Sequence, residues 1–443
     1  MRSSRRIFLR GIGTVAAAAA LGDIATLDAL SAHAASKTAI TFWCTPFVSG
    51  EDPLSFVKWF GQQQAKDLKS VTFSTDYGPG AYDTQQHKFI IQARTGTPDT
   101  LEGLLENMVA YIRAGLITPL TDRFHAWPEH GAFLDSTVKG LMFNGQLWGV
   151  PYNTNARVML YRKSILRKHG LKVPTTWDEL LTAAEAISAK EPGMSGFMLC
   201  TNRASVRGPQ EWISWFFQLN RHVFKQDPAT KKWKVSATPQ QLARVFQLYD
   251  NLFYGSRTPA ASTRNLGIDY NVLDDGYATG KWAMVPEGPW MYGQRTKGSQ
   301  QAYIMEHDTG IAPLPVAPGG SHGTYLEIKP ILLNKFSPHA DAAWTGIKYL
   351  ASFKILSEWA YVSGFIPPRK DIQQSPRFRN NWWQKGFGEL LGTGVYLDPL
   401  NWAPVFDAIF ATLQTVIYKK ATPMQAGTAL HARLSQLAVQ GLI

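Results

Sequence analysis

Residues that could carry covalent chemistry are scattered along this chain of 443 residues. Paired acids such as Asp274-Asp275 could in principle hydrolyse a glycosidic bond, but adjacent residues seldom face one another across a substrate. The segment from Gly276 to Lys281 is one residue short of a phosphate loop and continues with Trp instead of Ser or Thr. The sequence also lacks a His-Glu-x-x-His or Gly-x-Ser-x-Gly motif. We therefore expect no catalytic group, no metal site and no cofactor.

Aromatic residues near loop signals indicate binding chemistry instead. Flat rings stack on the apolar faces of sugar rings, and neighbouring Asp, Asn, Gln and Arg side chains can bind the hydroxyl groups. Any single Trp can equally pack inside a core, so both interpretations stay open for each one. The candidate aromatic residues are Trp43, Tyr77, Tyr82, Trp148, Tyr152, Trp212, Trp215, Trp290, Tyr325, Trp382, Trp383 and Trp402.

Composition places the chain among globular proteins long enough for two domains, with 45% hydrophobic and 18% charged residues. Lys and Arg number 45 against 33 Asp and Glu, a formal net charge of +12. Without residues 1–34, which hold four Arg and two Asp, the count is 41 against 31 and the charge is +10. These charges are dispersed, so they favour solubility or mild attraction to anions over nucleic-acid binding. Cys44 and Cys200 form no Cys-x-x-Cys pair, and we expect them to be unpaired or, if paired, to be structural.

Residues 1–34 are typical of an export signal. Arg5-Arg6 followed by Phe8-Leu9 resembles the twin-arginine signal, and the Ala-rich stretch that follows is as mildly apolar as that route requires. The segment ends in Ala-His-Ala, a cleavage-site pattern with no Cys after it, so we expect no lipid anchor. The sequence thus predicts a soluble periplasmic protein that meets the twin-arginine translocase during export.

Two other interpretations of this segment are weaker. Asp23 and Asp28 interrupt the apolar run before it reaches the roughly 20 residues that a membrane span needs. The Gly11-x-Gly13-x-x-Ala16 pattern imitates a dinucleotide fingerprint, but no strand precedes it.

The elements that would position a site begin with an alternating pattern. Strands are predicted over residues 39–43 and 71–74 with a helix over 53–68 between them, followed by a strand over 99–101 and a helix over 107–114. This order is typical of an open parallel α/β sheet, which binds ligands beyond the carboxyl ends of its strands. Residues 146–151 and 158–161 are also strand-like, and the polar segment 153–156 between them predicts a crossing between lobes.

Helix starts are marked by capping patterns. Thr176 with Glu179 and Thr422 with Gln425 each predict a capping box at the beginning of a helix. The stripe that begins with Trp177 in the first of these helices is assigned to the core. No internal repeat is present, so a solenoid or propeller is disfavoured.

Several motifs in a common order resemble the extracellular solute-binding proteins of the maltose-binding type, the substrate receptors of ABC sugar importers. The first runs from Thr97-Pro98-Asp99 to Pro-Leu-Thr-Asp at 119–122. The others are Gly-Gln-Leu-Trp-Gly-Val-Pro at 145–151, Leu-Tyr-Arg-Lys at 160–163, Pro-Thr-Thr-Trp-Asp-Glu-Leu at 174–180, Gly-Lys-Trp-Ala-Met at 280–284, Gly-Pro-Trp at 288–290, Gly-Ile-Ala-Pro-Leu-Pro at 310–315 and Gly-Phe-Ile-Pro-Pro-Arg at 364–369.

The resemblance implies an α/β, two-lobed periplasmic-binding-protein fold of type II, with a ligand cleft between lobes that close by hinge motion. It places one lobe at residues 35–153 plus 313–351 and the other at 154–312 plus 352–443. The three hinge crossings then fall near 152–156, 311–314 and 351–353.

The resemblance also implies a site and partners. Trp290 of Gly-Pro-Trp is expected to stack on the ligand and not to belong to the core, with Trp402 matched loosely. The full set of expected ligand-binding residues is Trp43, Tyr82, Asn153, Asn155, Trp212, Trp215, Trp290, Tyr325 and Trp402. The expected partners are a mono- or oligosaccharide and the membrane permease subunits of an ABC transporter, with the receptor itself a monomer.

Two alternatives remain open. One is a receptor for an anionic polyol such as a glycerophosphate-type solute, suggested by the basic charge and by Arg203, Arg207 and Arg257. The other is an exported carbohydrate-active enzyme, which the missing acid-base pair disfavours.

Overall fold

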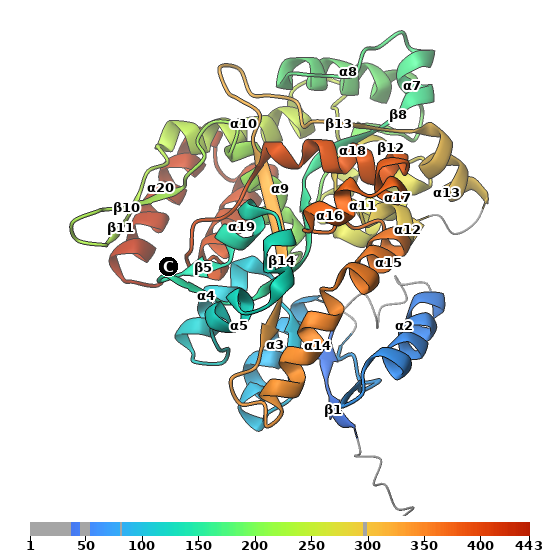
Figure 1. Cartoon of the computed structure of the whole chain (residues 1–443). Helices are drawn as coiled ribbons and strands as arrows, with labels where there is room; N and C mark the ends of the chain where they lie inside the picture. The colour runs from blue at the N-terminus through green and yellow to red at the C-terminus, as the bar shows by residue number, and fades with distance from the viewer. Residues whose placement is uncertain (1–36, 45–53, 80–81, 296–298) are drawn as a thin grey trace, which may run out of the picture. The chain divides into compact units, whose positions relative to one another are not determined.

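The strand predicted at residues 39–43 forms as β1 (Thr38–Ile40) and β2 (Phe42–Trp43) in the computed structural model (Figure 1). The structure describes residues 37–44, 54–79, 82–295 and 299–443, so the predicted export signal lies outside the described residues. β1 pairs in parallel with β3 (Val71–Phe73), and α2 (Leu54–Asp67) is the helix between them in the chain. The predicted βαβ unit is therefore confirmed.

The first lobe is built around a mixed sheet. Its described strands follow the order β15 (Gly394–Val395), β14 (Thr324–Leu333), β4 (Thr100–Glu102) and β2, with β7 (Val150–Ala156) also paired to β14. β2 and β4 are parallel, but β14 runs antiparallel to both β4 and β7, so the expectation of an open parallel sheet is corrected. All residues of β7 and β14 are buried.

The polar segment 153–156 was predicted as a joint between two strands, and this prediction is wrong in detail. These residues belong to β7, because each of their positions pairs with β14 from Leu326 to Lys329. β7 ends at Ala156 and the next strand begins at Val158, so the chain passes from the first sheet to the second at Arg157.

The second lobe is built around another mixed sheet. Its described strands follow the order β13 (Thr309–Ala312), β8 (Val158–Arg162), β12 (Trp282–Glu287) and β9 (Ser195–Phe197). β12 is antiparallel to β8 and parallel to β9. The chain returns to the first sheet between Ala312 and Thr324, and α14 (Ala340–Leu350) meets α15 (Phe353–Ser363) at the third predicted crossing. The exact lobe boundaries stay a prediction.

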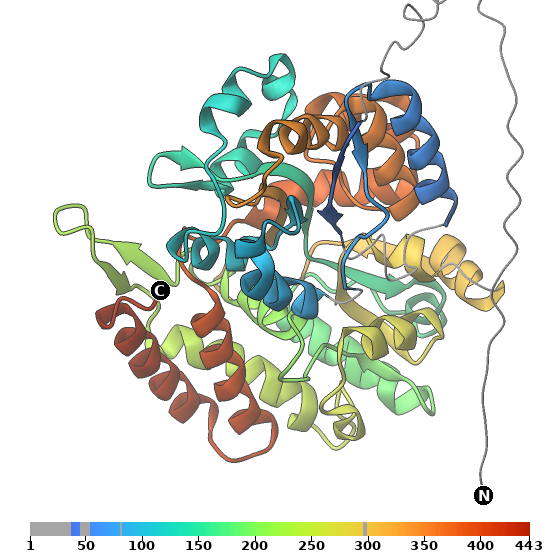
Figure 2. The ribbon, with the colours of Figure 1, turned by 90° about the horizontal axis from the view of Figure 1, so that it is seen from below.

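Helices flank both sheets, and α10 (Pro239–Tyr254) and α20 (Pro423–Val439) lie side by side in both views (Figures 1 and 2). Their contact is so close that a Cβ atom on Gly427 would lie 2.4 Å from the Pro239 carbonyl oxygen.

Within the described residues, none of the helices combines the length and apolar character that crossing a bilayer demands. The remaining helices are α3 (Tyr82–Gln92), α4 (Leu105–Arg113), α5 (Thr121–His125), α6 (Asp135–Gly140), α7 (Lys163–Lys168), α8 (Trp177–Lys190), α9 (Arg207–Phe216), α10 (Pro239–Tyr254), α11 (Tyr270–Ala278), α12 (Met291–Arg295), α13 (Ser299–Tyr303), α16 (Lys370–Gln374), α17 (Pro376–Arg379), α18 (Trp382–Leu390), α19 (Ala403–Ile417) and α20 (Pro423–Val439).

The capping predictions hold in part. The box at Thr422 and Gln425 forms as predicted at the start of α20. At the start of α8, Thr176 accepts from the Glu179 N–H, but the Glu179 carboxylate accepts from the backbone and hydroxyl of Thr175, so no reciprocal box forms. A complete box that the analysis missed caps α10 at Thr238, in a Thr-Pro-x-Gln segment like the one at 422–425.

Candidate functional site

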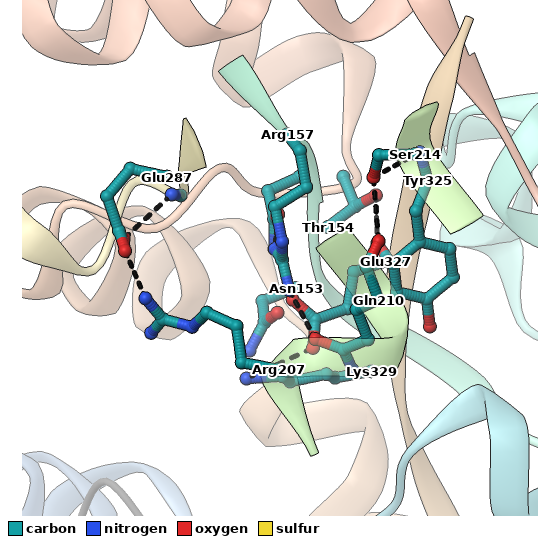
Figure 3. A network of polar contacts seen from close by, with 12 residues as sticks. Asn153, Thr154, Arg157, Arg207, Gln210, Ser214, Glu287, Tyr325, Glu327 and Lys329 are labelled. Carbon is teal, nitrogen blue, oxygen red and sulfur yellow. Dashed lines mark hydrogen bonds and ion pairs between the residues drawn. The ribbon is translucent and has the colours of Figure 1, made fainter. Parts of the chain in front are cut away.

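The position where the chain passes between the two sheets carries a buried cation. Arg157 is 1% exposed, and its Nη1 donates to Asn155 Oδ1 at 2.5 Å and to Glu327 Oε2 at 3.1 Å. Its Nη2 donates to Gln210 Oε1, in the first turns of α9. One side chain thus joins β7, β14 and a helix of the second lobe (Figure 3).

The register of β14 on β7 places a second charge pair beside Arg157. Glu327 is opposite Asn155, and Lys329 is opposite Asn153. Glu327 Oε2 accepts from Asn155 Nδ2 at 2.7 Å, and its Oε1 lies 3.8 Å from Lys329 Nζ. Burial favours the neutral acid, but Lys329, Arg157 and these hydrogen bonds outweigh it and lower the pKa of Glu327 to about 2. Glu327 is therefore an ionised, buried carboxylate at neutral pH.

Lys329 is surrounded by aromatic rings. Its Nζ donates to the Tyr82 hydroxyl at 3.0 Å and lies 5.1 Å from the centre of the Phe365 ring and 6.0 Å from that of Trp290. Such positions over ring faces stabilise an ammonium group where water is excluded. Lys329 is 4% exposed, so this environment replaces most of its hydration.

Arg207 supplies the third cation, from the first turn of α9. Its guanidinium donates to Asp274 Oδ1 at 2.6 Å and also contacts Glu287, at the end of β12. Burial raises the pKa of Glu287 well above its ordinary value, and the neighbouring Asp274 carboxylate raises it further, against the attraction of Arg207. Figure 3 shows the Arg207 side chain directed toward Glu287.

Trp290 follows the end of β12, as the sequence predicted. Gly288 is required there, because a Cβ atom on it would lie 2.0 Å from Trp290 Cη2. The guanidinium carbons of Arg157 and Arg207 lie 4.6 and 4.5 Å from the centre of the Trp290 ring. The ring is 5% exposed, and its Nε1 is buried without a hydrogen-bond partner in the described part of the chain.

These side chains surround one small cavity of about 50 Å³. Ligand pockets for drug-sized molecules measure roughly 300–1,000 Å³, so this cavity is smaller than a solute of that size needs. Side chains from the first sheet and from elements next to the second sheet both line this cavity. It is lined by Tyr82, Leu104, Arg157, Val206, Arg207, Gln210, Tyr270, Trp290, Glu327, Lys329 and Phe365.

Of the predicted site residues, Trp290 and Tyr82 line this cavity. Asn155 and Tyr325 lie behind it, where Asn155 binds Glu327 and the Tyr325 hydroxyl donates to Glu106 Oε2 at 2.9 Å. Asn153 donates to Glu102 Oε1 at 2.9 Å and is fully buried.

Four predicted Trp residues do not line the cavity. Trp212 stacks on Phe216, and Trp215 packs edge-on against Trp177. Trp402 packs against Phe406 at the start of α19, and Trp43 covers Gly78 with its ring beneath Lys88. All four are at most 2% exposed, and this core packing is the reason that we leave them out of the proposed site.

Sequence patterns did not predict four residues of the cavity lining: Arg157, Gln210, Glu327 and Lys329. One available signal was the alternation of Glu327 and Lys329 in an otherwise apolar run, which places both on one face of a strand. Of the three Arg residues considered for an anionic solute, Arg207 lines the cavity. Arg203 forms an exposed ion pair with Asp407 and Arg257 is exposed in a loop.

The cysteines behave as expected. Cys44 Sγ lies 3.3 Å from Glu102 Oε2 as a donor, and burial raises the pKa of Cys200 to about 12. Within the described residues no disulfide joins them.

Comparison with known proteins shows the family of this chain. A sequence model of the family described as "Bacterial extracellular solute-binding protein" matches residues 55–385. A probable ABC transporter-binding protein of Deinococcus radiodurans is 23% identical over 326 residues, which cover 71% of this chain and 74% of that protein.

Solved structures show the same fold. The GacH receptor of Streptomyces glaucescens, studied unliganded and with acarbose, has a TM-score of 0.77 at 20% identity and covers 91% of this chain and 99% of its own. Maltose-bound MalE3 of T. maritima has a TM-score of 0.76 at 22% identity, with 90% and 99% covered. These likenesses confirm the predicted two-lobed α/β periplasmic-binding-protein fold.

Proposed function

Because this chain belongs to the bacterial extracellular solute-binding protein family, we propose that it is the receptor of an ABC importer for a carbohydrate or sugar-like solute. It binds the solute between its lobes and delivers it to the membrane permease. The relative named as a probable ABC transporter-binding protein supports a role in an ABC transporter. The fold shared with proteins bound to acarbose and maltose supports a carbohydrate as the solute.

One observation carries the proposal: both lobes contribute side chains to the wall of the same cavity. Glu327 and Lys329 come from the first sheet, whereas Arg207 and Trp290 come from elements next to the second. A solute in contact with both sets gains contacts that exist only when the lobes are close together. Such differential contacts are what allow a ligand to shift an open protein toward its closed state.

We also propose where the protein acts. Arg5 and Arg6 are recognised by the twin-arginine translocase, and the mature chain is released into the periplasm as a monomer without a lipid anchor. The lobes, at 35–153 plus 313–351 and 154–312 plus 352–443, move about the three crossings.

A thermal-shift panel tests this function. A solute at 100 times its dissociation constant stabilises the folded chain by about 2.7 kcal/mol, so true ligands stand out clearly from other sugars. Recovery of the solute after incubation separates a receptor from an enzyme: a receptor returns labelled oligosaccharides unchanged, and conversion to products would support the exported carbohydrate-active enzyme instead.

A further inference from the structure

We propose that the solute carries an acid group, and that Lys329, Arg157 and the Trp290 indole N–H bind it in the cavity between the lobes. This inference rests on the proposed function, since it specifies the class of sugar-like solute. The shared chemistry is an oxyanion on a polyhydroxylated molecule, as in a uronic acid or a sugar phosphate.

The first support is the charge of the wall. Among the described lining residues, Arg157, Arg207 and Lys329 are cationic, whereas Glu327 alone is a carboxylate. Arg207 is already paired with Asp274 and Glu287, neither of which lines the cavity. Among the described lining residues, Arg157 and Lys329 therefore share the single carboxylate of Glu327.

Two deeper acids, Glu106 and Glu102, are bound by other side chains. Glu106 is held by hydrogen bonds from Gln210 and Tyr325, and Glu102 by hydrogen bonds from Asn153 and Cys44. Neither of them lines the cavity, and burial raises the pKa of both, which favours their neutral forms.

The second support is the kind of hydrogen-bonding capacity left over. Arg157 Nε and Trp290 Nε1 are both buried and have no partner in the described residues, and both can only donate. Lys329 Nζ carries three N–H bonds that can each donate. The acceptors near it include the Tyr82 hydroxyl oxygen at 3.0 Å and Glu327 Oε1 at 3.8 Å. Burying a hydrogen-bond donor without an acceptor costs free energy, so an occupant rich in acceptor atoms fits this wall best. An oxyanion offers acceptors alone.

Pairs of probes that differ only in the acid group test the inference on the full mature chain. D-glucuronate and D-galacturonate are compared with D-glucose and D-galactose, and glucose 6-phosphate adds a phosphate arm. Glycerol 3-phosphate tests an acidic polyol that is not a sugar. We expect at least one acidic probe to bind at least about tenfold more tightly than its neutral partner, with an affinity that falls as salt rises.

The outcomes separate this inference from the proposed function. Binding of a neutral sugar as tight as that of its acidic partner, or no stabilisation by any acidic probe, would overturn the inference; in the first case the carbohydrate function stands. Binding of glycerol 3-phosphate with no binding of any sugar would keep the acid group and overturn the carbohydrate.

Variants locate the group. Lys329→Gln removes the charge but keeps a polar side chain, one atom shorter, against the aromatic rings. We expect it to weaken binding of the acidic probe about 10- to 100-fold while the affinity for a neutral sugar changes less than about threefold. Arg203→Gln, outside the cavity, is the control and should bind like the wild type. An equal loss of affinity for the acidic and the neutral probe in Lys329→Gln would contradict the assignment of Lys329 to the acid group.

Discussion

The side chain of Gln210 joins the two lobes, because its Nε2 donates to Glu106 Oε1 at 2.7 Å while its Oε1 accepts from Arg157. Gln210 lies in α9, which follows β9 of the second sheet, and Glu106 lies in α4, which follows β4 of the first. The contact therefore exists only when the lobes are close together, and it reaches Arg157, where the chain crosses between them (Figure 3).

Gln210→Ala should shift the unliganded protein toward the open state. Loss of the two hydrogen bonds costs the closed form about 0.5–1.5 kcal/mol each, or about 1–3 kcal/mol together, which weakens solute binding by roughly 5- to 150-fold. Small-angle scattering should show a larger radius of gyration without solute. Gln247→Ala, which removes an exposed contact with Asn251 on α10, is the control. Unchanged scattering and affinity in Gln210→Ala would show that this contact does not hold the lobes together.

Trp290→Ala should act mainly on binding. Loss of one stacking ring is expected to weaken binding by roughly 1–3 kcal/mol, about 5- to 150-fold. The matched control is Trp215→Ala, whose ring packs against Trp177 and Phe197 and should cost roughly 3–5 kcal/mol of folding stability. Calorimetric titration and melting of both variants decide the matter. An unchanged affinity with a large fall in melting temperature would assign Trp290 to the core.

Glu327 should make the fold sensitive to acid. Its pKa falls from an ordinary 4.5 to about 2, so its stabilising contribution is present above pH 4.5 and is lost as pH falls toward 2. The full contribution is about 3 kcal/mol, at about 1.36 kcal/mol per pKa unit. Urea unfolding at pH 7, 4 and 3 should show a loss of stability in the wild type that is smaller in Glu327→Gln. Equal pH profiles for the two proteins would rule out this role.

Replacement of Arg5 and Arg6 together by Lys should trap the precursor in the cytoplasm, since the Arg pair is the recognised element of the proposed signal. Replacement of Arg2 and Arg10 by Lys conserves the same charges outside the pair and should leave export normal. Cell fractionation measures both, and periplasmic accumulation of the Arg5 and Arg6 variant would contradict twin-arginine export.

Local signals in the sequence predicted much of the fold. The alternation at 39–43 and 71–74 predicted the pairing of β1 with β3, and the Gly-Pro-Trp motif predicted that Trp290 would follow a strand end. The Thr-Pro-x-Gln pattern predicted the cap of α20 because all its contacts are within one turn. The same pattern at Thr238 was available and was missed.

The centre of the site could not be predicted in the same way. Arg157 meets Glu327 only because β14 pairs with β7 in one particular register, and the two residues are far apart in the sequence. The polar side chains of Asn153 and Asn155 indicated a connection between two strands. In the structure their backbone groups pair with β14, and their side chains bind buried carboxylates. Trp212 and Trp215 were predicted to bind ligand but belong to the core. No sequence pattern distinguishes a Trp in a buried helix from a Trp in a binding cleft.

The most direct measurement is a calorimetric titration of the mature wild-type chain with the paired neutral and acidic sugars, followed by chromatography of the recovered solute. We expect saturable binding of one solute per chain, with the solute recovered unchanged. Absence of binding heat for every sugar at several temperatures, or recovery of a converted product, would contradict the claim that this protein is a carbohydrate receptor.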